Sequence, residues 1–151
     1  GKIDSPPQSF IGAADVPKRP DAKWSPVPLQ KKIEAGADFI QTQFGFDLDV
    51  VRAYAERLRA EGITEKLGVI IGVGPIRSAK SARWMNENLF GVTVPEAIIA
   101  RIEAAKDQAA EGRRVCAELI EGLKQIPGIA GAHIMAPAQG TDAIAAVLDS
   151  L

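Results

Sequence analysis

Four short apolar runs, each followed by a segment with helical spacing, constrain the fold of this chain more than any other feature. The runs cover residues 10–14, 38–43, 67–71 and 131–136. Buried strands that alternate with amphipathic helices are typical of parallel β/α units. Residues 67–71 are almost continuously apolar, as expected of a strand that is covered on both faces. We therefore predict an α/β fold of four parallel β/α units, either half of an eight-stranded barrel or a small open sheet.

Helix signals fill the gaps between these runs. Proline is compatible with a first helical turn, serine and aspartate cap helices, and glycine suits the position just after a helix. The helical spacing near Pro95 continues along one chain segment from Ile98 to Leu123. The first expected helix covers residues 29–35 and ends before Gly36, the second begins after Asp47 or Asp49, and the third runs from Ser78 to Leu89. A further helix begins near Pro95, and the last one includes Ile144 and Val147.

The prolines divide the chain unevenly. Six of the ten prolines lie in the first 28 residues, together with the short run at 10–14, which we predict to be a buried strand. We therefore describe residues 1–28 as a proline-rich initial segment that includes the first strand. Residues 29–151 would hold the remaining β/α units of the same half-barrel domain.

Composition excludes several functional classes. A net charge of −1 gives no reason to expect a nucleic-acid surface, and no apolar run approaches the roughly 20 residues that span a bilayer. The beginning of the chain has no apolar signal-peptide core. One cysteine cannot form an internal disulfide, which fits a reducing compartment such as the cytoplasm, and one cysteine with one histidine makes a zinc site within one chain unexpected.

The glycine-rich turn at residues 72–81 follows a strand and precedes a helix. A dinucleotide fingerprint requires a third glycine where Arg77 stands, and a phosphate-binding P-loop requires glycine where Ala79 precedes Lys80 and Ser81. Both motifs therefore fail. A tight turn followed by a helix capped by Ser78 is the simpler interpretation, although loops at the carboxyl ends of barrel strands carry ligands.

Isolated side chains leave alternatives open. Gln43 could present its amide donor and acceptor together to a heterocyclic ligand, but spacing alone favours a solvated or locally bonded glutamine. His133, inside an apolar strand, is either a packed and hydrogen-bonded residue or a neighbour of a ligand. Cys116 is expected to be buried packing, while Trp24 and Trp84 are expected to pack or to lie at a rim.

A set of segments also follows the order and spacing of one known enzyme family. The run from Lys32 to Asp47 is the most specific, and the glycine-proline turn and the final strand support it. The other segments are residues 10–14 with Pro17, Leu29 onward, 72–76, Val94 with Pro95, and 131–133. Together they resemble the second half of methylenetetrahydrofolate reductase, over nearly the whole chain.

This resemblance implies the second half of a flavin-dependent (β/α)8 TIM barrel, with this chain supplying the fifth to eighth strands. In that family, FAD accepts hydride from NAD(P)H and passes it to methylenetetrahydrofolate, which becomes methyltetrahydrofolate. By position, the resemblance implies FAD contacts at Ala13, Asp15, Arg19 and Lys32, where Lys32 would neutralise a flavin phosphate. It implies substrate contacts at Gln43, which would pair with the pterin edge, and at Met85 and Gln139.

The resemblance also implies that the chain is incomplete alone. The family's acidic proton donor lies in the first half of the barrel, so no catalytic residue is expected here, and the N-terminal half would be a partner, with an oligomer expected. Asp15, Arg19, Met85 and Gln139 depart from the residue types usual in the family. Two alternatives follow: a non-catalytic half-barrel that binds a ligand or partner, and a related one-carbon enzyme that uses another pterin.

Overall fold

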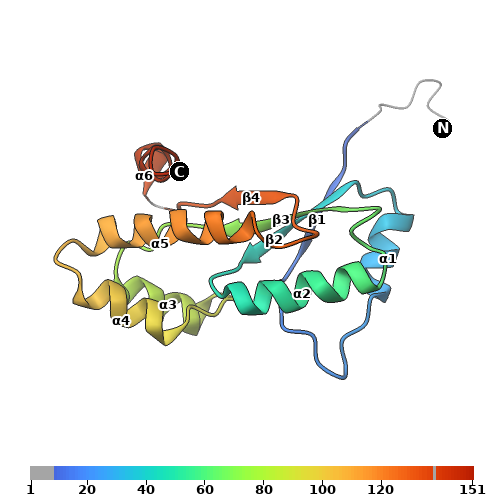
Figure 1. Cartoon of the computed structure of the whole chain (residues 1–151), viewed down its shortest axis with the longest axis horizontal. Helices are drawn as coiled ribbons and strands as arrows, with labels where there is room; N and C mark the ends of the chain where they lie inside the picture. The colour runs from blue at the N-terminus through green and yellow to red at the C-terminus, as the bar shows by residue number, and fades with distance from the viewer. Residues whose placement is uncertain (1–8, 138) are drawn as a thin grey trace.

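The computed structural model describes residues 9–137 and 139–151, in which four strands form one parallel sheet (Figure 1). Each strand pairs with the next one along the chain, in the order β1-β2-β3-β4. An order that never reverses is the connectivity of a barrel, not of a doubly wound sheet. The predicted four parallel β/α units are therefore confirmed as a half-barrel. The strands are β1 (Gly12–Asp15), β2 (Phe39–Phe44), β3 (Gly68–Val73) and β4 (Gly131–Ile134).

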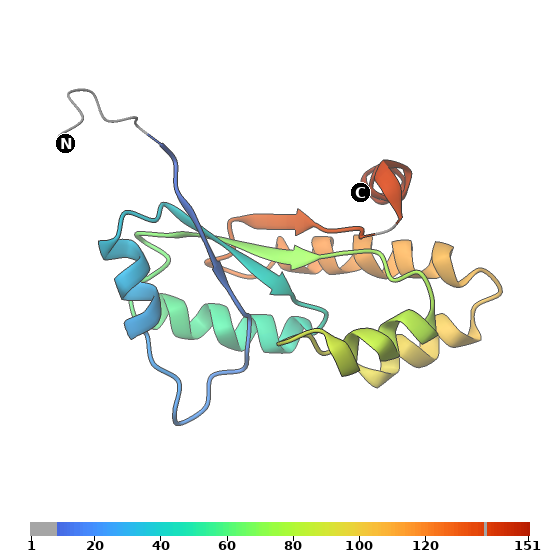
Figure 2. The same ribbon diagram turned by 180° about the vertical axis from the view of Figure 1, so that it is seen from behind.

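Six helices connect and follow these strands within the described residues. They are α1 (Val27–Glu34), α2 (Leu48–Ala60), α3 (Ala79–Asn88), α4 (Glu96–Ala104), α5 (Gln108–Leu123) and α6 (Gly140–Leu148). Figure 2 shows α2 and α5 along one side of the sheet, and α6 at the carboxyl end of β4. None of the helices in residues 9–137 and 139–151 is long and apolar enough to cross a membrane.

The core lies between the sheet and its helices, on one face of the sheet only. Ile40, Val69 and Ile71 are fully buried there. On the opposite face Gln41 is exposed and Ile70 is only partly buried. The prediction that residues 67–71 are covered on both faces is therefore wrong for this structure, because helices of the described chain cover a single face.

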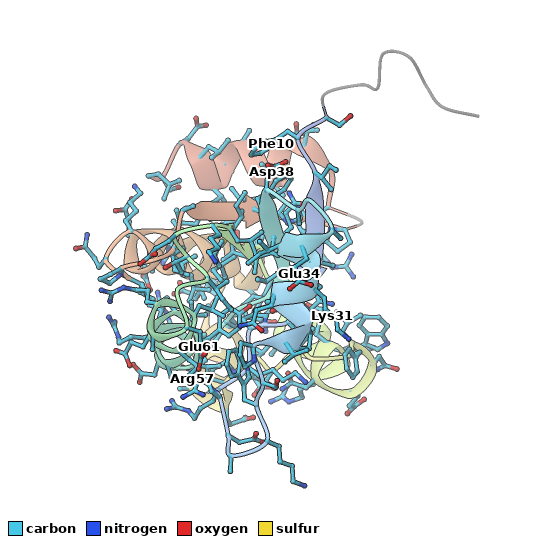
Figure 3. The ribbon with its side chains drawn as sticks, turned by 90° about the vertical axis from the view of Figure 1, so that its right-hand side faces the viewer. Phe10, Lys31, Glu34, Asp38, Arg57 and Glu61 are labelled. Atoms are coloured by element: carbon cyan, nitrogen blue, oxygen red, sulfur yellow. The ribbon has the colours of Figure 1, made fainter. Side chains whose placement is uncertain are left out.

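The first strand also differs from the prediction. The run 10–14 was expected to be a buried strand, but β1 begins at Gly12 and includes Asp15, and Phe10 is 78% exposed. Phe10 instead stacks on Phe39 across the uncovered face, with ring centroids 5.1 Å apart. The N–H of Ile11 donates to Asp38 Oδ2 over 2.7 Å, and Figure 3 shows Phe10 and Asp38 at this end of the sheet. An apolar side chain on the bare face at this edge of the sheet stays exposed.

The caps explain where the helices begin. Asp47 accepts hydrogen bonds from the N–H groups of Asp49 and Val50 at the start of α2, and Ser78 forms a capping box with Ser81 at the start of α3. The helical spacing expected to continue from Ile98 to Leu123 is interrupted, because Asp107 caps a new helix by accepting from the N–H of Ala110. α4 and α5 are therefore separate helices.

Side chains also join the helices to one another. Arg83 of α3 makes two hydrogen bonds to Glu103 of α4, and Arg101 of α4 bonds Glu111 and Glu118 of α5. The amide of Asn86 both donates to the carbonyl of Val94 (3.0 Å) and accepts from its N–H (2.6 Å). These contacts hold α3, α4, α5 and the segment between α3 and α4 together.

Candidate binding site at the carboxyl ends of the strands

A cavity of about 490 Å³ opens beside the carboxyl ends of β2, β3 and β4, and we call it the mouth cavity. Its wall is mainly apolar, and Trp84 stands at its rim with 54% of its surface exposed. Parallel β/α folds bind ligands at this end of the sheet. The lining residues are Phe44, Phe46, Gly74, Pro75, Ile76, Arg77, Ser78, Lys80, Ser81, Trp84, Met85, Leu89, Met135, Pro137 and Gln139.

Two glycines allow the backbones beside the mouth cavity to approach closely: Gly74, which lines the cavity, and Gly72 of β3. A Cβ at Gly74 would lie 2.1 Å from the carbonyl oxygen of Met135, and one at Gly72 would lie 2.5 Å from that of Thr42. Any larger residue would push these backbones apart. The N–H of Gly72 donates to Thr42 Oγ1 where the β2–β3 register shifts, between Gln41 and Phe44. This irregularity places Phe44 on the cavity wall, stacked on Phe46.

The structure brings two of the three predicted substrate residues to the mouth cavity. Met85 of α3 lines it, and Gln139 closes it on the other side, where its Nε2 donates to the carbonyl of Pro75 over 2.7 Å. Gln43 does not line the cavity. Its Oε1 accepts from the N–H of Phe44 over 3.1 Å, so the locally bonded interpretation describes this conformation.

A polar cluster occupies the carboxyl end of β1, and we call it the β1 cluster: Asp15, Lys32 and Tyr54. Lys32 Nζ donates to the carbonyl of Ala14 (2.5 Å) and lies 3.4 Å from Asp15 Oδ1. The hydroxyl of Tyr54 donates to Asp15 Oδ2. Burial raises the pKa of Tyr54 far above its ordinary value, and the negative charge of Asp15 raises it further. The hydroxyl therefore stays protonated and fixes the carboxylate.

The four residues predicted to contact FAD do not all come together. Asp15 and Lys32 pair with each other, while Ala13 packs against the core. Arg19 lines a separate hollow of about 310 Å³ with Lys18 and Gly45. The ammonium of Lys32 has three N–H donors, two of which are engaged, and its side chain is 30% exposed. Lys32 therefore retains one donor for a phosphate oxygen, which fits the anionic part of a flavin cofactor.

Sequence reasoning missed Tyr54 as a site residue because it belongs to the apolar stripe of α2. The one available signal was chemical: a tyrosine on a buried stripe needs a partner for its hydroxyl. Phe44 and Met135 were also missed, since a wall residue of a cavity cannot be distinguished from core by spacing. Trp84 does lie at a rim, and half-buried Trp24 packs under Arg57 at 5.2 Å, as the sequence predicts.

Two further candidates have structural roles. Cys116 is fully buried, and burial raises the pKa of its thiol to about 12, so it is packing, as predicted. His133 is packed in β4 opposite Gly72, but within the described residues its buried Nδ1 has no hydrogen-bond partner. The expectation of a hydrogen-bonded histidine is thus not met at that atom. In residues 9–137 and 139–151, no three His, Cys, Asp or Glu side chains cluster as metal ligands.

Comparison with known proteins gives a consistent set of matches. The family model for methylenetetrahydrofolate reductase matches residues 10–151. Methylenetetrahydrofolate reductase 1 of Schizosaccharomyces pombe is 32% identical over 96 residues, which are 61% of this chain and 15% of that protein. Methylenetetrahydrofolate reductase 2 of Saccharomyces cerevisiae is 29% identical over 122 residues, which are 76% of this chain and 20% of that protein.

A solved structure has the same fold. It is an uncharacterized protein from Clostridium thermocellum, described as binding two copies of 5-methyl-5,6,7,8-tetrahydrofolic acid, and it superposes with a TM-score of 0.65 at 17% identity. The superposition covers 93% of this chain and 51% of that chain. The present chain therefore spans about half of this relative and a fifth or less of the two curated ones.

Proposed function

The chain belongs to the methylenetetrahydrofolate reductase family, and on that premise we propose that its mouth cavity holds the ring system of a reduced folate. The observation that carries this proposal is the cavity itself. Its aromatic and thioether walls, which include Phe44, Trp84, Met85 and Met135, suit a flat heterocycle, and an amide stands at its rim. The folate named for the Clostridium thermocellum relative agrees with this ligand class.

Gln43 does not line the mouth cavity in this conformation, but it directly precedes the wall residue Phe44, and we propose that its side chain turns to recognise the pterin edge. Within the described residues its Oε1 is bonded only to its own neighbour's N–H, and its Nε2 makes no hydrogen bond. A ligand with an adjacent donor and acceptor would therefore replace one weak local bond with two bonds to one amide. Met85 and Gln139 would contact the ligand from opposite sides of the cavity.

The finer proposal is that the complete enzyme reduces methylenetetrahydrofolate to methyltetrahydrofolate. When bound, FAD supplies the transfer of hydride from NAD(P)H to the folate. Lys32 would hold a flavin phosphate through its remaining N–H, while Asp15 and Tyr54 keep the ammonium in place. Arg19, from the neighbouring hollow, would add a second positive charge. The acidic proton donor would come from the N-terminal half of the barrel.

Fluorescence of Trp84 offers a direct test, since this side chain stands at the cavity rim. In a Trp24→Phe background, Trp84 is the sole tryptophan of the chain. We expect 5-methyltetrahydrofolate to change its emission in a saturable way. Gln43→Ala should weaken binding by about tenfold, because it removes two hydrogen bonds to the ligand.

Gln41→Ala is the matched control, since Gln41 is an exposed glutamine of the same strand. It should bind folate as the parent does. If no folate binds, the proposed role of the mouth cavity is wrong. If the Gln43→Ala and Gln41→Ala variants bind folate equally well, the proposed role of Gln43 is wrong.

A non-catalytic folate-binding half-barrel is the second candidate function. The observation that favours it is the β1 cluster, in which Asp15 is already bonded by Tyr54 and Lys32 and so is not a free acid or base. Adding FAD separates the two functions. A shifted flavin absorption spectrum that depends on Lys32 supports the reductase, whereas folate binding without any flavin binding supports the non-catalytic module.

A further inference from the structure

Two polar side chains are buried within the part of the chain that the structure describes, Thr42 and Glu111. Glu111 forms ion pairs with two arginines, Arg101 and Arg114, which neutralise its charge. Thr42 is uncharged, and a valine would fill the same space without a polar atom to satisfy. The hydroxyl of Thr42 therefore needs hydrogen-bond partners in the core, and its position in β2 supplies them.

Thr42 lies in an irregularity of β2 that ends at Phe44, a wall residue of the mouth cavity. From Gln41 to Phe44 the strand advances by three positions, while the paired segment of β3, from Ile70 to Gly72, advances by two. One strand therefore carries an extra residue, which makes a β-bulge. An extra residue interrupts the ladder of backbone hydrogen bonds, so other groups must bond the backbone there.

The hydroxyl of Thr42 bonds the backbone of the bulge in both directions. It accepts a hydrogen bond from the N–H of Gly72 over 3.0 Å, and it donates one to the carbonyl of Gln43 over 2.8 Å. The carbonyl of Gly72 accepts from the N–H of Gly45 over 2.8 Å. Thr42 thus joins the two strands at the bulge and fixes the carbonyl of the residue that follows it.

The peptide group between Gln43 and Phe44 is held at both of its ends. Thr42 bonds its carbonyl, and the side chain of Gln43 bonds its N–H, since Gln43 Oε1 accepts from Phe44 over 3.1 Å. If the Gln43 side chain turns to a ligand, the N–H loses this bond. The hydroxyl of Thr42 then still fixes the peptide, and with it the direction in which the Gln43 side chain leaves the backbone.

We propose that Thr42 is a positioning residue for ligand recognition, which holds the peptide after Gln43 while the Gln43 amide binds the ligand. The proposal rests on the proposed folate site. Thr42 is buried and does not line the mouth cavity, so it acts through Gln43 and not by contact with the ligand. An amide that is already positioned loses less conformational freedom on binding, so the Thr42 hydroxyl increases the affinity for folate.

Substitutions at positions 42 and 43, alone and combined, test this role in the Trp84 fluorescence assay with 5-methyltetrahydrofolate. Thr42→Val removes the hydroxyl and keeps the shape of the side chain, and it should weaken binding about fivefold. In a Gln43→Ala background the same substitution should weaken binding by less than about twofold, because no amide remains to be positioned. Thr42→Ser keeps the hydroxyl and should bind folate within about twofold of the parent.

Thr64→Val is the matched control, because half-buried Thr64 lies before the amino end of β3 and does not line the mouth cavity. It should leave the affinity for folate unchanged. A loss of affinity in Thr42→Val that is equally large in the Gln43→Ala background, or that Thr42→Ser shares, would mean that Thr42 only supports the fold. Either result overturns the proposal.

Nuclear magnetic resonance of the parent chain gives a readout that does not depend on any variant folding correctly. When 5-methyltetrahydrofolate binds, the Gly72 amide should stay protected from hydrogen exchange, because it still donates to Thr42. The amide resonance of Phe44 should shift, because Gln43 releases it. Loss of protection at Gly72, or an unchanged Phe44 resonance, contradicts the proposal.

Failure of this role differs from failure of the folate site. Binding that weakens in Gln43→Ala but not in Thr42→Val overturns the role of Thr42 and leaves the folate site as proposed. Absence of folate binding by the parent chain overturns the proposed function and the role of Thr42 with it.

Discussion

The carboxyl ends of the first two strands and of the last two are built in opposite ways. Beside β1 and β2, polar groups satisfy one another in the β1 cluster, where Asp15 is bonded by both Lys32 and Tyr54. Beside β3 and β4, glycines bring backbones into direct contact and an apolar cavity remains, at whose edge Arg77 and Lys80 form no ion pair within the part of the chain that the structure describes. In the first region Asp15 is paired with neighbouring groups of the protein. In the second region cationic side chains at the cavity edge remain free to contact a ligand.

This difference in charge pairing makes the two regions suitable for different parts of a ligand. Unpaired charge beside an apolar hollow suits a ligand that is itself part ring and part anion. The carboxylate of Asp15, which the buried hydroxyl of Tyr54 holds in place, can in turn fix the position of the Lys32 ammonium. We infer that the β3–β4 side would bind the larger part of a folate and that the β1 cluster would contribute a single positive contact.

The largest expected effect comes from the backbone contact on the β3–β4 side. Gly112→Ala would place a methyl group against the carbonyl of Ile76, which cannot move aside as a side chain does. We expect a loss of about 3 kcal/mol or more of unfolding free energy, measured by urea denaturation. Gly131→Ala is the control, because no atom lies within 4 Å of its added methyl group, and it should change the stability by less than about 0.5 kcal/mol. Equal losses would show that α5 does not depend on this close approach.

A second prediction concerns the hydroxyl in the β1 cluster. Tyr54 is the only tyrosine of the chain, so the absorbance of tyrosinate reports on this residue alone. Its pKa is raised in the folded state, so its contribution to stability is present below its ordinary pKa of 10.0 and decreases as the pH rises above that value. We expect no tyrosinate signal until the chain unfolds in alkali.

Tyr54→Phe should cost about 1–3 kcal/mol at neutral pH, since one oxygen of Asp15 loses its donor. It should also remove most of the tyrosine-linked decrease in stability at alkaline pH. Ionisation of Tyr54 near pH 10 in a chain that is still folded would contradict the β1 cluster as described.

The smallest effect on stability is expected at the rim of the mouth cavity. Trp84 is 54% exposed, so Trp84→Ala should change the unfolding free energy by less than about 1 kcal/mol. The same substitution should weaken folate binding severalfold, because it removes an aromatic wall from the cavity. Stability is measured by urea denaturation and folate binding by calorimetric titration. A large loss of stability with unchanged folate binding would mean that Trp84 is a core residue and does not contribute to a binding site on the β3–β4 side.

Much of the fold could be predicted because its signals are local. The caps at Asp47 and Ser78 and the alternation of strands and helices depend on neighbouring residues, and the structure agrees with them. The break before α5 also had a local signal, an aspartate three residues before Ala110, but the apolar spacing across it was the stronger pattern. The uncovered face of the sheet had no local signal, because the same apolar residues would also be found in a strand that is covered on both faces.

The candidate site was less predictable because its contacts join distant parts of the chain. Asp15 and Tyr54 are separated by 39 positions, and Gln139 and Pro75 by 64. Spacing within one helix or strand carries no information on such pairs. Gln43, Met85 and Gln139 were identified through the resemblance to a family, yet only the fold shows that two of them share a cavity and that Gln43 turns to its own backbone.

The amide of Asn86 has a consequence for the chemical ageing of this protein. It contacts both the N–H and the carbonyl of Val94, as a neighbouring peptide group would. Hydrolysis of that amide would replace its NH₂ donor with a carboxylate oxygen that faces the carbonyl of Val94, so an attraction would become a repulsion. Direct hydrolysis at this single position would thus loosen the segment that connects α3 to α4, and with it the Leu89 wall of the mouth cavity, without any change in the number of residues.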